Sequence, residues 1–380
     1  MSRVLVAGAG LAGTLLAGIL ARSGFEVVLA EQRSRKSEIG AGVTLHGNGN
    51  AALQNTGLGA ALATVGRPIG RLDVHVLDQD ETPTTGASVD IAALWPDTTP
   101  ALAVHRQELH SLLLRHVGDV DVRLGSRVTR VAPHGDRMTA TIGDGPAQPF
   151  DLVVGADGIG SAVRAAVDPD ARPRDLGQTY LRTVADLQGE VDVDWAVWHR
   201  QDANAGLLRL RDGCFHVFVQ LSGPRRGLAG RGMAGVLAEV FPDVPELTGA
   251  AGRVGRAHVT QVARVSCESG RGAVALVGDA AHGTSPVLSQ GASLAFEDVV
   301  VLGEELARGD TVGGIDRYRA QRRARIAWLH RMTRLHSGAV RRPWTASAAD
   351  LDAVYRQTYA GFADAVTARP SERPVEVGAS

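Results

Sequence analysis

The first 31 residues alternate between apolar runs and glycine-containing breaks. Residues 4–7 and 25–30 are short apolar runs, typical of strands buried on both faces, and residues 14–22 between them have the composition of a buried helix. The apolar stretch from 4 to 21 also resembles a signal peptide or membrane anchor, but three glycines divide it into a strand, a turn and a helix. The pattern therefore predicts a strand–helix–strand unit.

The same rules divide the rest of the chain. Helices are expected over 50–62, 106–116, 292–306 and 315–335, and strands over 71–77, 127–131, 138–142, 150–154, 207–211, 214–220 and 273–277. Asp212 and Gly213 form a strong turn pair, so the strands beside them are expected to make a hairpin. Another helix is expected to open at 155–161, and residues 78–100, rich in Thr, Pro and Asp, are expected to contain loops and short strands.

Composition narrows the class of protein. The chain has 380 residues, 44% of them hydrophobic and 21% charged, which favours a soluble enzyme with more than one domain and excludes a disordered chain. The formal net charge of −1 argues against a nucleic-acid-binding surface. Cys214 and Cys267 are the only cysteines and lie in no Cys/His cluster, so neither a disulfide framework nor a metal site is expected. We expect a cytoplasmic protein.

The basic residues carry a strong bias. Of the 40 lysines and arginines, only Lys36 is a lysine, so chemistry that needs a buried active-site lysine is disfavoured. Several arginines lie on the predicted helix 315–335, whose apolar residues form a stripe. We interpret this helix as packed on one face and solvated on the other, in preference to a nucleic-acid or membrane surface.

A glycine motif lies between the first predicted strand and helix. Gly8, Gly10 and Gly13 have the spacing Gly-x-Gly-x-x-Gly, and Glu31 ends the second strand 18 residues after the last glycine. Such glycines allow a tight turn, close approach to a pyrophosphate and close helix–strand packing, while the helix N-terminus offers N–H groups to the phosphates. An acidic residue at this strand end binds a ribose 2′-hydroxyl, which favours FAD or NAD over NADP.

Two further motifs follow apolar strands. Residues 157–164 read Asp-Gly-Ile-Gly-Ser-Ala-Val-Arg, and residues 278–282 read Gly-Asp-Ala-Ala-His, with Pro286 and the Gln-Gly pair 290–291 beyond them. Taken singly, each motif is explained equally well as a turn with an Asp that caps a helix.

Together, in this order and at these separations, the three motifs resemble those of the single-component (class A) FAD-dependent aromatic hydroxylases, which share the para-hydroxybenzoate hydroxylase fold. The resemblance covers residues 3 to 335. It implies an α/β fold in which a Rossmann-like FAD-binding domain is interleaved with a substrate domain built on a β-sheet, followed by C-terminal helices. We expect the boundaries to be 1–70, 101–175 and 266–310 for the FAD-binding domain, 71–100 and 176–265 for the substrate domain and 311–368 for the helices, with a disordered tail at 369–380.

The resemblance also implies which residues hold a non-covalent FAD. Glu31 belongs to the ADP-binding fingerprint, Arg106 reaches the flavin side, Asp279 holds the ribityl chain and Gly40 to Val43 form the loop beside the isoalloxazine. The full implied set is Gly8, Gly10, Leu11, Ala12, Gly13, Glu31, Gln32, Arg33, Gly42, Val43, Arg106, Asp157, Gly158, Arg164, Gly278, Asp279, Pro286, Gly291, Ala292 and Ser293.

The chain departs from the family pattern in the loop after Pro286. Ser289 stands where the family has glycine, and a positive φ at this position would cost about 1 kcal/mol or more. Ser293 stands where the family has asparagine, but serine can still cap a helix. A helix beginning near Gly291 would direct its N–H groups at the pyrimidine edge of the flavin, where the reduced cofactor is anionic.

Four residues are candidates for the catalytic chemistry. Arg209 and His216, on the predicted hairpin, could bind and polarise a phenol or a carboxylate, although a solvated arginine and a hydrogen-bonded structural histidine would explain them too. His46, just after the flavin loop, is a second candidate base, because imidazole titrates near working pH. Pro286 completes the set through its place in the flavin loop, whereas His282 is expected to be structural.

The resemblance implies a monooxygenase cycle. NADH or NADPH would reduce FAD, O2 would add at flavin C4a, and the terminal oxygen of the hydroperoxide would pass to an aromatic or heteroaromatic small molecule. An epoxidase or Baeyer–Villiger-type oxygenase of the same fold, an FAD-dependent dehydrogenase and a non-enzymatic escort protein remain alternatives. We expect a monomer or homodimer that binds neither nucleic acid nor membrane.

Overall fold

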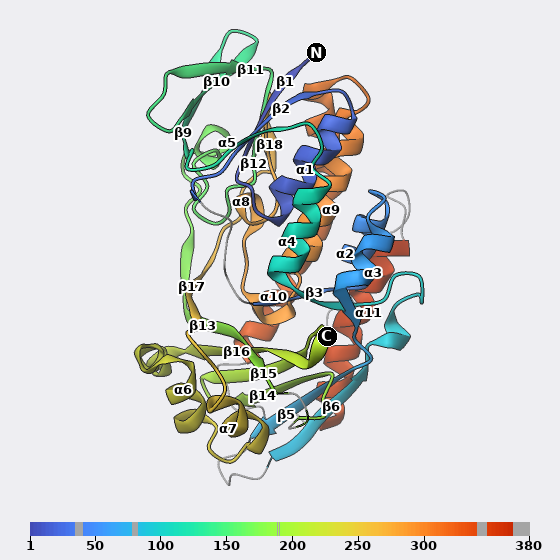
Figure 1. Ribbon diagram of the computed structural model, residues 1–380, viewed down its shortest axis with the longest axis vertical. Coiled ribbons are helices and arrows are strands. Elements are labelled where there is room, and N and C mark those ends of the chain that lie inside the picture. The colour runs from blue at the N-terminus through green and yellow to red at the C-terminus, as the bar shows by residue number, and fades with distance from the viewer. Residues whose placement is uncertain (35–40, 78–82, 188, 190, 340–347, 368–380) are drawn as a thin grey trace, which may run out of the picture.

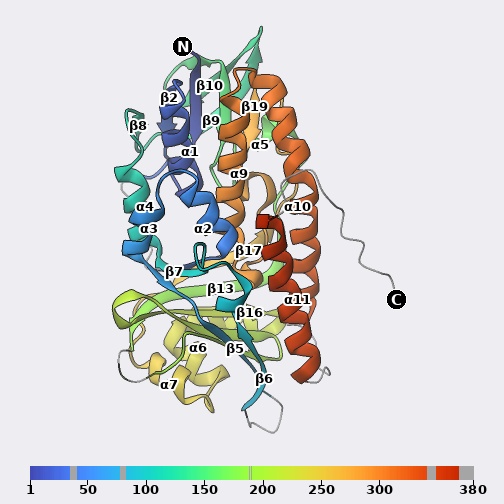
Figure 2. The ribbon, with the colours of Figure 1, turned by 90° about the vertical axis from the view of Figure 1, so that its right-hand side faces the viewer.

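The computed structural model describes residues 1–34, 41–77, 83–187, 189, 191–339 and 348–367. The molecule has an upper and a lower half in Figure 1, each built on its own large sheet. Helices α10 (Thr311–Ala339) and α11 (Ala348–Thr367) run along one side, and α10 extends over both halves (Figure 2). None of the helices in the described ranges combines the length and apolar composition needed to cross a bilayer. Gly40 and the tail 369–380 lie outside the described residues.

A six-stranded sheet of order β18-β19-β12-β1-β2-β8 organises the upper half. Its strands are β1 (Arg3–Ala7), β2 (Glu26–Ala30), β8 (Asp121–Arg123), β12 (Leu152–Gly155), β18 (Gly270–Arg271) and β19 (Val274–Leu276). All neighbours pair in parallel except β18 and β19. The central strands are buried on both faces, which is why their sequences read as unbroken apolar runs.

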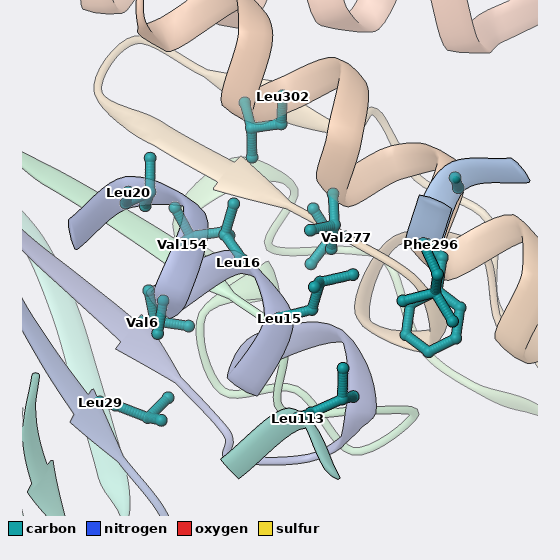
Figure 3. Close-up of a cluster of buried hydrophobic side chains, with 14 of the residues drawn as sticks. Val6, Leu15, Leu16, Leu20, Leu29, Leu113, Val154, Val277, Phe296 and Leu302 are labelled. Carbon is teal, nitrogen blue, oxygen red and sulfur yellow. The ribbon is translucent and has the colours of Figure 1, made fainter. Parts of the chain in front are cut away.

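Helices cover one face of this sheet. They are α1 (Leu11–Arg22), α4 (Arg106–Arg115) and α9 (Gly291–Leu306). Figure 3 shows Leu16 of α1 beside Val154 of the sheet, with Leu302 of α9 above them, and all three are completely buried. The other face packs against the three-stranded sheet of β9 (Val128–His134), β10 (Arg137–Ile142) and β11 (Ala147–Phe150), and against α5 (Arg164–Val167).

Shorter elements connect the two halves. A small sheet contains β3 (Gly42–Leu45), β4 (Gly66–Pro68) and β7 (Leu102–His105), with helices α2 (Gly47–Gln54) and α3 (Gly59–Val65) between its strands. Two further short elements lie between β19 and α9 in the chain, namely α8 (Asp279–His282) and the 3-10 turn η4 (Pro286–Leu288).

The lower half contains a seven-stranded sheet of order β17-β13-β16-β15-β14-β5-β6. Its strands are β5 (Arg71–Leu77), β6 (Pro83–Asp90), β13 (Arg174–Asp186), β14 (Trp195–Arg200), β15 (Ala203–Arg209), β16 (Cys214–Ser222) and β17 (His258–Arg264). The outer face packs on α6 (Gly232–Val240) and α7 (Pro245–Ala251), while the inner face is turned toward the upper half. This architecture confirms the predicted α/β fold.

Several local predictions differ from the structure. The helix expected over 50–62 is two helices, because Gly57 between them has a φ of +83°. The apolar run 150–154 is divided between β11 and β12, which belong to different sheets. The helix expected after 161 has only four residues, and the loop-like composition of 78–100 conceals the eight-residue strand β6.

Candidate active site

The three glycine-containing motifs meet because they follow three adjacent parallel strands. β1, β12 and β19 end in register, with Ala7 beside Gly155 and Gly155 beside Leu276. The carboxyl ends of neighbouring parallel strands open on the same edge of a sheet, which is where nucleotides bind in such folds. Segments far apart in the chain thus form one continuous wall.

Two connected cavities, of about 360 and 420 Å³, follow this wall. Both are lined by Gly10, Ala156, Gly158 and Ile159, so they form one elongated groove. Most of the residues implied to hold FAD line it, namely Gly8, Gly10, Leu11, Ala12, Glu31, Gln32, Arg33, Gly42, Val43, Arg106, Asp157, Gly158, Gly278, Asp279, Pro286, Gly291 and Ala292. Gly13, Arg164 and Ser293 do not line it.

The glycines of the first motif serve different purposes. Gly8 has a φ of +98°, and a Cβ there would lie 2.5 Å from the Ala156 carbonyl oxygen. Gly13 lies behind the groove, where a Cβ would approach the Gly8 carbonyl oxygen to 1.9 Å, so its absence lets α1 pack on the turn. A Cβ at Gly10 would meet no protein atom within 4 Å and would project into the groove. Two glycines therefore shape the protein, and Gly10 leaves room for a ligand.

Glu31 closes the outer end of the groove. Its carboxylate accepts hydrogen bonds from the main-chain N–H groups of Ala9 and Arg33, both at 2.9 Å. These contacts fix the side chain beside the glycine turn and leave further lone pairs for a ribose hydroxyl. His110 of α4 steadies the same turn, because its Nε2 lies 2.8 Å from the Ala9 carbonyl oxygen.

The second motif is tied to the third by Arg164. Its guanidinium donates hydrogen bonds to the carbonyl oxygens of Ala280, at 2.9 Å, and Ile159, at 2.7 Å, and the side chain is buried. Arg164 therefore supports the wall from behind, where a cofactor does not reach. Asp157 accepts the Ala162 N–H at 2.7 Å, as expected of a helix-capping residue, and also lines the groove.

The third motif is held by a buried ion network. Asp298 of α9 accepts the Gly278 N–H at 2.9 Å, contacts His282 Nε2 at 2.5 Å, and pairs with Arg322 of α10 at 2.8 Å. Burial alone would raise the pKa of Asp298, but His282 and Arg322 hold it below its ordinary value. His282 is thus part of the support, in keeping with the structural role expected for it. Asp279 itself faces the groove, and burial raises its pKa.

The flavin end of the groove is formed by the loop after Pro286 and the start of α9. Gly291 and Ala292 place the N-terminus of this 16-residue helix at the cavity, where its free N–H groups favour negative charge. Ser289 adopts the left-handed conformation, with φ 52° and ψ 23°, as its position in the family pattern implies. Ser293 was expected to bind the cofactor or cap the helix. Instead it is buried within α9, and its hydroxyl accepts the His46 N–H at 3.1 Å.

The opposite wall is the inner face of the lower sheet. His216 and Phe218 of β16 lie beside Leu208 of β15 and Tyr180 and Arg182 of β13. Trp195 of β14 continues the same face. Among these only His216 was identified from the sequence. The alternation of Tyr180 and Arg182 with buried neighbours marks a strand face, but which face meets the cofactor depends on pairing between distant strands.

Two candidate catalytic residues lie elsewhere. Arg209 pairs with Phe215 across the hairpin, so it shares the outer face with the odd-numbered residues, opposite His216. Its guanidinium donates hydrogen bonds to the carbonyl oxygens of Val193 and Val191, at 2.9 and 2.7 Å, and therefore supports a loop. This corrects the expectation that Arg209 and His216 act together.

His46 is also outside the groove. It is completely buried, and its ring lies 5.3 to 6.3 Å, between ring centroids, from the rings of Trp95, Trp195, Tyr359 and Phe362. Burial lowers the pKa of His46 to about 3, with a smaller opposing effect from the Leu288 main chain. A neutral imidazole in this aromatic cluster is a core residue, which corrects its proposed role as a base.

The groove has the features that FAD requires. It is long and continuous, a glycine turn and helix N-terminus stand at its centre, a fixed carboxylate stands at one end, and a second helix N-terminus stands at the other. Within the described residues, Gly10 leaves open space at the point where the two cavities join.

Comparison with known proteins agrees with this geometry. Residues 1–333 match the family described as FAD binding domain. The 2-heptyl-3-hydroxy-4(1H)-quinolone synthase of Pseudomonas aeruginosa is 30% identical over 369 residues, which cover 90% of this chain and 91% of that protein. The 3-hydroxybenzoate 6-hydroxylase 1 of Aquipseudomonas alcaligenes is 31% identical over 359 residues, covering 88% and 89%.

A solved structure supports the same fold. Klebsiella pneumoniae HpxO, complexed with FAD and uric acid, superimposes with a TM-score of 0.82 at 23% identity, covering 96% of this chain and 97% of that one. The family match over most of the chain, the relatives at 30% identity or more and the continuous groove lead to the same conclusion. The chain belongs to the FAD-dependent aromatic hydroxylases, and it is an FAD-dependent flavoprotein monooxygenase.

Proposed function

We propose that this enzyme uses NADH or NADPH and O2 to insert one oxygen atom into a small aromatic or heteroaromatic molecule that carries a ring hydroxyl or N–H group. The observation that carries the proposal is the position of His216, which lies on the sheet wall of the groove with its Nδ1 held against the Thr183 carbonyl oxygen. Bound FAD would accept an electron pair from the nicotinamide and transfer it to O2, with one oxygen atom entering the substrate and the other leaving as water.

The tautomer of His216 follows from its hydrogen bond. Its Nδ1 lies 3.1 Å from the Thr183 carbonyl oxygen, which can only accept, so Nδ1 carries the proton and Nε2 keeps its lone pair. Burial is the main cause that lowers the pKa of His216 to about 4; the hydrogen bond to the Thr183 carbonyl opposes it, and the charges of Arg182 and His105 make smaller contributions in the same direction as burial. Nε2 is therefore an acceptor throughout the neutral pH range.

An acceptor at this position would select and activate the substrate. A ring hydroxyl or N–H group that donates to Nε2 becomes more electron-rich, as attack by an electrophilic oxygen atom requires. With a pKa of about 4, His216 accepts the hydrogen bond but does not take the proton from the substrate, so the hydroxyl or N–H group keeps its proton, and the proton displaced from the ring carbon by the incoming oxygen atom goes to solvent.

The neighbouring residues suit a flat ring. Gly206 leaves space that the Phe218 ring fills, since a Cβ there would lie 2.3 Å from Phe218 Cζ. Tyr180 and His216 lie on either side of Phe218, with ring centroids 5.8 and 5.7 Å away. Leu208 completes an apolar surface that excludes water, which oxygen transfer needs. Burial raises the pKa of Tyr180 to about 12, so its hydroxyl stays protonated and can donate.

The loop beside the flavin also depends on this wall. A Cβ at Gly42 would lie 2.5 Å from the His216 Cβ, so the loop passes directly against the proposed acceptor. Pro286, which lines the same cavity and has no N–H group, adds an apolar wall at the start of η4. We propose that these two residues keep the reacting side of the groove narrow and dry.

The test is a screen of phenols and N-heteroaromatic compounds with the FAD-loaded protein. An authentic substrate should stimulate NADH or NADPH oxidation and yield a product with one oxygen atom from isotopically labelled O2. Product structure separates hydroxylation from epoxidation and Baeyer–Villiger insertion. Conversion without O2 would establish a dehydrogenase, and a purified protein that retains no FAD would contradict the enzyme assignment.

Variants of His216 test the proposed acceptor. His216→Phe should lower product formed per NAD(P)H by about 100-fold while cofactor oxidation continues and H2O2 accumulates, because the substrate is no longer activated. His216→Gln, whose Oε1 can accept, should recover part of the loss. His134→Phe on exposed β9 is the matched control and should behave as the wild type. Unchanged coupling in His216→Phe would remove this residue from the mechanism.

A further inference from the structure

A third cavity, of about 500 Å³, lies outside the groove, between strand β4 and residues 209–215 at the turn of the β15–β16 hairpin. We call it the outer cavity. Among the described residues, none that lines it also lines the groove. Arg209 and Phe215, which line it, lie on the face of the hairpin opposite His216. The hairpin therefore separates two cavities, and the size of the outer one is within the range of small-molecule sites, about 300–1,000 Å³.

The outer cavity lies at the junction of the two halves of the molecule. Strand β4 of the small connecting sheet lines one side, and the hairpin turn of the lower sheet lines the other. Two of the lining arginines bridge this junction. Arg67 of β4 pairs with Asp194 at 2.6 Å, and Arg211 of the turn donates a hydrogen bond to the Ala63 carbonyl oxygen of α3 at 3.1 Å. A ligand in the outer cavity would therefore contact both sides of the junction.

Positive charge exceeds negative charge around the outer cavity. Arg67, Arg209 and Arg211 line it, and none of its described lining residues is acidic. Asp194 neutralises Arg67, whereas the Asp192 carboxylate that contacts Arg209 at 3.1 Å is fully exposed to solvent. Within the described part of the chain, Arg211 forms no ion pair. The outer cavity thus offers a guanidinium group to an anion.

The deeper residues of the outer cavity are apolar. Val191, Leu210 and Phe215 line it, and all three side chains are buried. The Cζ atom of Arg209 lies over the Phe215 ring, 5.2 Å from its centroid. Guanidinium groups bind carboxylates through paired N–H groups and also stack on flat rings. An apolar surface beside guanidinium groups therefore suits a molecule with one carboxylate and a flat apolar body.

The small sheet connects the outer cavity with the groove. Gly66 of β4 pairs with Val104 of β7, and Val104 pairs with Val43 of β3. Gly66 lines the outer cavity, whereas Val43 lines the groove in the loop beside the flavin. Because hydrogen-bonded strands hold one another in place, a ligand that fixes β4 also restrains the flavin loop without entering the groove.

We propose that the outer cavity binds a small organic carboxylate and that this ligand strengthens the binding of FAD. The carboxylate pairs with Arg211, and the apolar body lies against Leu210 and Phe215. An inorganic anion would use the arginines but leave the apolar surface uncovered, which favours an organic acid. Because coupling between two sites is reciprocal, bound FAD strengthens the binding of the carboxylate by the same factor.

The first experiment is a calorimetric titration of the FAD-loaded protein with 2-naphthoate, with uncharged 2-naphthamide as the matched probe. The wild type should bind naphthoate more tightly than naphthamide. Arg211→Gln should raise the Kd of naphthoate about threefold to tenfold, because one partly solvated charge-assisted contact is lost, and Arg211→Glu should raise it further. Arg211 is exposed, so both variants should unfold at the wild-type temperature. Arg323→Gln removes an exposed charge on α10 and should leave the Kd unchanged.

A variant of the groove identifies the site that the probe occupies. His216→Phe lies on the opposite face of the hairpin and should leave the Arg211-dependent binding of naphthoate unchanged. If His216→Phe weakens the binding and Arg211→Gln does not, the probe binds in the groove and the inference is wrong. Equal affinities for naphthoate and naphthamide, or no binding of naphthoate, would also contradict it.

The second experiment measures the connection between the two sites. Apoprotein is titrated with FAD, followed by flavin fluorescence, with and without saturating 2-naphthoate. Naphthoate should lower the Kd for FAD about fivefold in the wild type and leave it unchanged in Arg211→Glu. An unchanged Kd in the wild type would overturn the proposed effect on FAD, and a Kd raised in both proteins would show competition in the groove. Neither titration uses NADH, NADPH or O2, so the results are independent of the proposed reaction.

Discussion

The two walls of the groove are built in different ways. The upper wall consists of main chain and glycine, so its shape depends on close approaches such as that between Gly13 and the Gly8 carbonyl oxygen. The lower wall consists of side chains on alternate positions of β13, β15 and β16, so its chemistry depends on which strands pair and in which register. The difference matches the proposed roles, in which the upper wall holds a cofactor shared by a whole family and the lower wall fits a particular substrate.

The largest expected effect contrasts two glycines of the upper wall. Gly13→Ala should cost about 3 kcal/mol and abolish FAD retention, because its Cβ would overlap a main-chain oxygen that cannot move freely. Gly10→Ala should leave the stability of the apoprotein nearly unchanged, since its Cβ meets no protein atom, yet weaken FAD binding by projecting into the groove. Flavin content after gel filtration and thermal unfolding of the apoproteins measure both. Equal losses of apoprotein stability would contradict this division of roles.

The same contrast explains what the sequence could predict. The strand–helix–strand unit and the three motifs were identified because glycine spacing and apolar runs are local signals, and β1 and β2 end where expected. The convergence of the motifs follows from parallel pairing of β19, β12 and β1, which the family resemblance implied. Arg164 and Ser293 were assigned to the cofactor, but their partners, Ala280 and His46, lie on other elements and cannot be identified from local spacing.

The lower wall was much less predictable. Arg209 and His216 both lie on the expected hairpin, but their relative faces depend on the turn at 211–213, which pairs Arg209 with Phe215. Strand β6 was hidden by its polar composition, and Arg182 gave no motif at all. A period of two predicts that a strand has two faces, but only tertiary pairing decides which face meets the cofactor.

A comparable loss of stability, with a smaller effect on FAD retention, is expected at the ion network that supports the upper wall. Arg322 pairs with Asp298 at 2.8 Å and Glu297 at 2.7 Å, and all three side chains are largely buried. Arg322→Met should cost about 3–5 kcal/mol, because it leaves two carboxylates buried without their cation, and it should weaken the support of Gly278. Arg323→Met, an exposed neighbour, is the control and should change stability by less than about 0.5 kcal/mol. Thermal unfolding that does not distinguish the two would show that the network is dispensable.

A smaller effect is expected in the pH dependence of the free energy of unfolding, to which the buried histidines contribute. Burial lowers the pKa of His199, His216 and His336 to about 4, so in this range the unfolded chain binds protons that the folded chain does not. The free energy of unfolding should therefore fall as pH decreases from 6.5 toward 4, and not change through these groups above 6.5. Arg322 and Arg325 lower the pKa of Glu297 to about 2 against the effect of burial. The stability that Glu297 contributes is therefore lost mainly below about pH 4.5, and the change between pH 6.5 and 4.5 comes from the histidines.

Replacing one histidine sharpens that test. His336→Gln removes a buried group and should make the decline between pH 6.5 and 4.5 shallower by up to about 1.4 kcal/mol per pH unit. His134→Gln on exposed β9 removes a histidine that is solvated in both states and should leave the slope unchanged. Chemical denaturation at several pH values gives the slopes, and parallel lines for the wild type and His336→Gln would contradict the assignment.

The smallest effect compares the two described non-glycine residues with positive φ, one in each half. Ser289, at 52°, lines the flavin end of the groove, and Asp202, at 61°, lies between β14 and β15. Glycine at either position removes about 1 kcal/mol of backbone strain from the folded protein, and less at Asp202 because Asp tolerates this conformation better. Glycine also makes the unfolded chain more flexible, which lowers the free energy of unfolding by about 0.4–1 kcal/mol and offsets that gain. Both Ser289→Gly and Asp202→Gly should therefore change apoprotein stability by less than about 1 kcal/mol. Because only Ser289 lines the groove, only Ser289→Gly should alter the Kd for FAD, and an equal change in both variants would show that loop strain, not local contact, controls cofactor affinity.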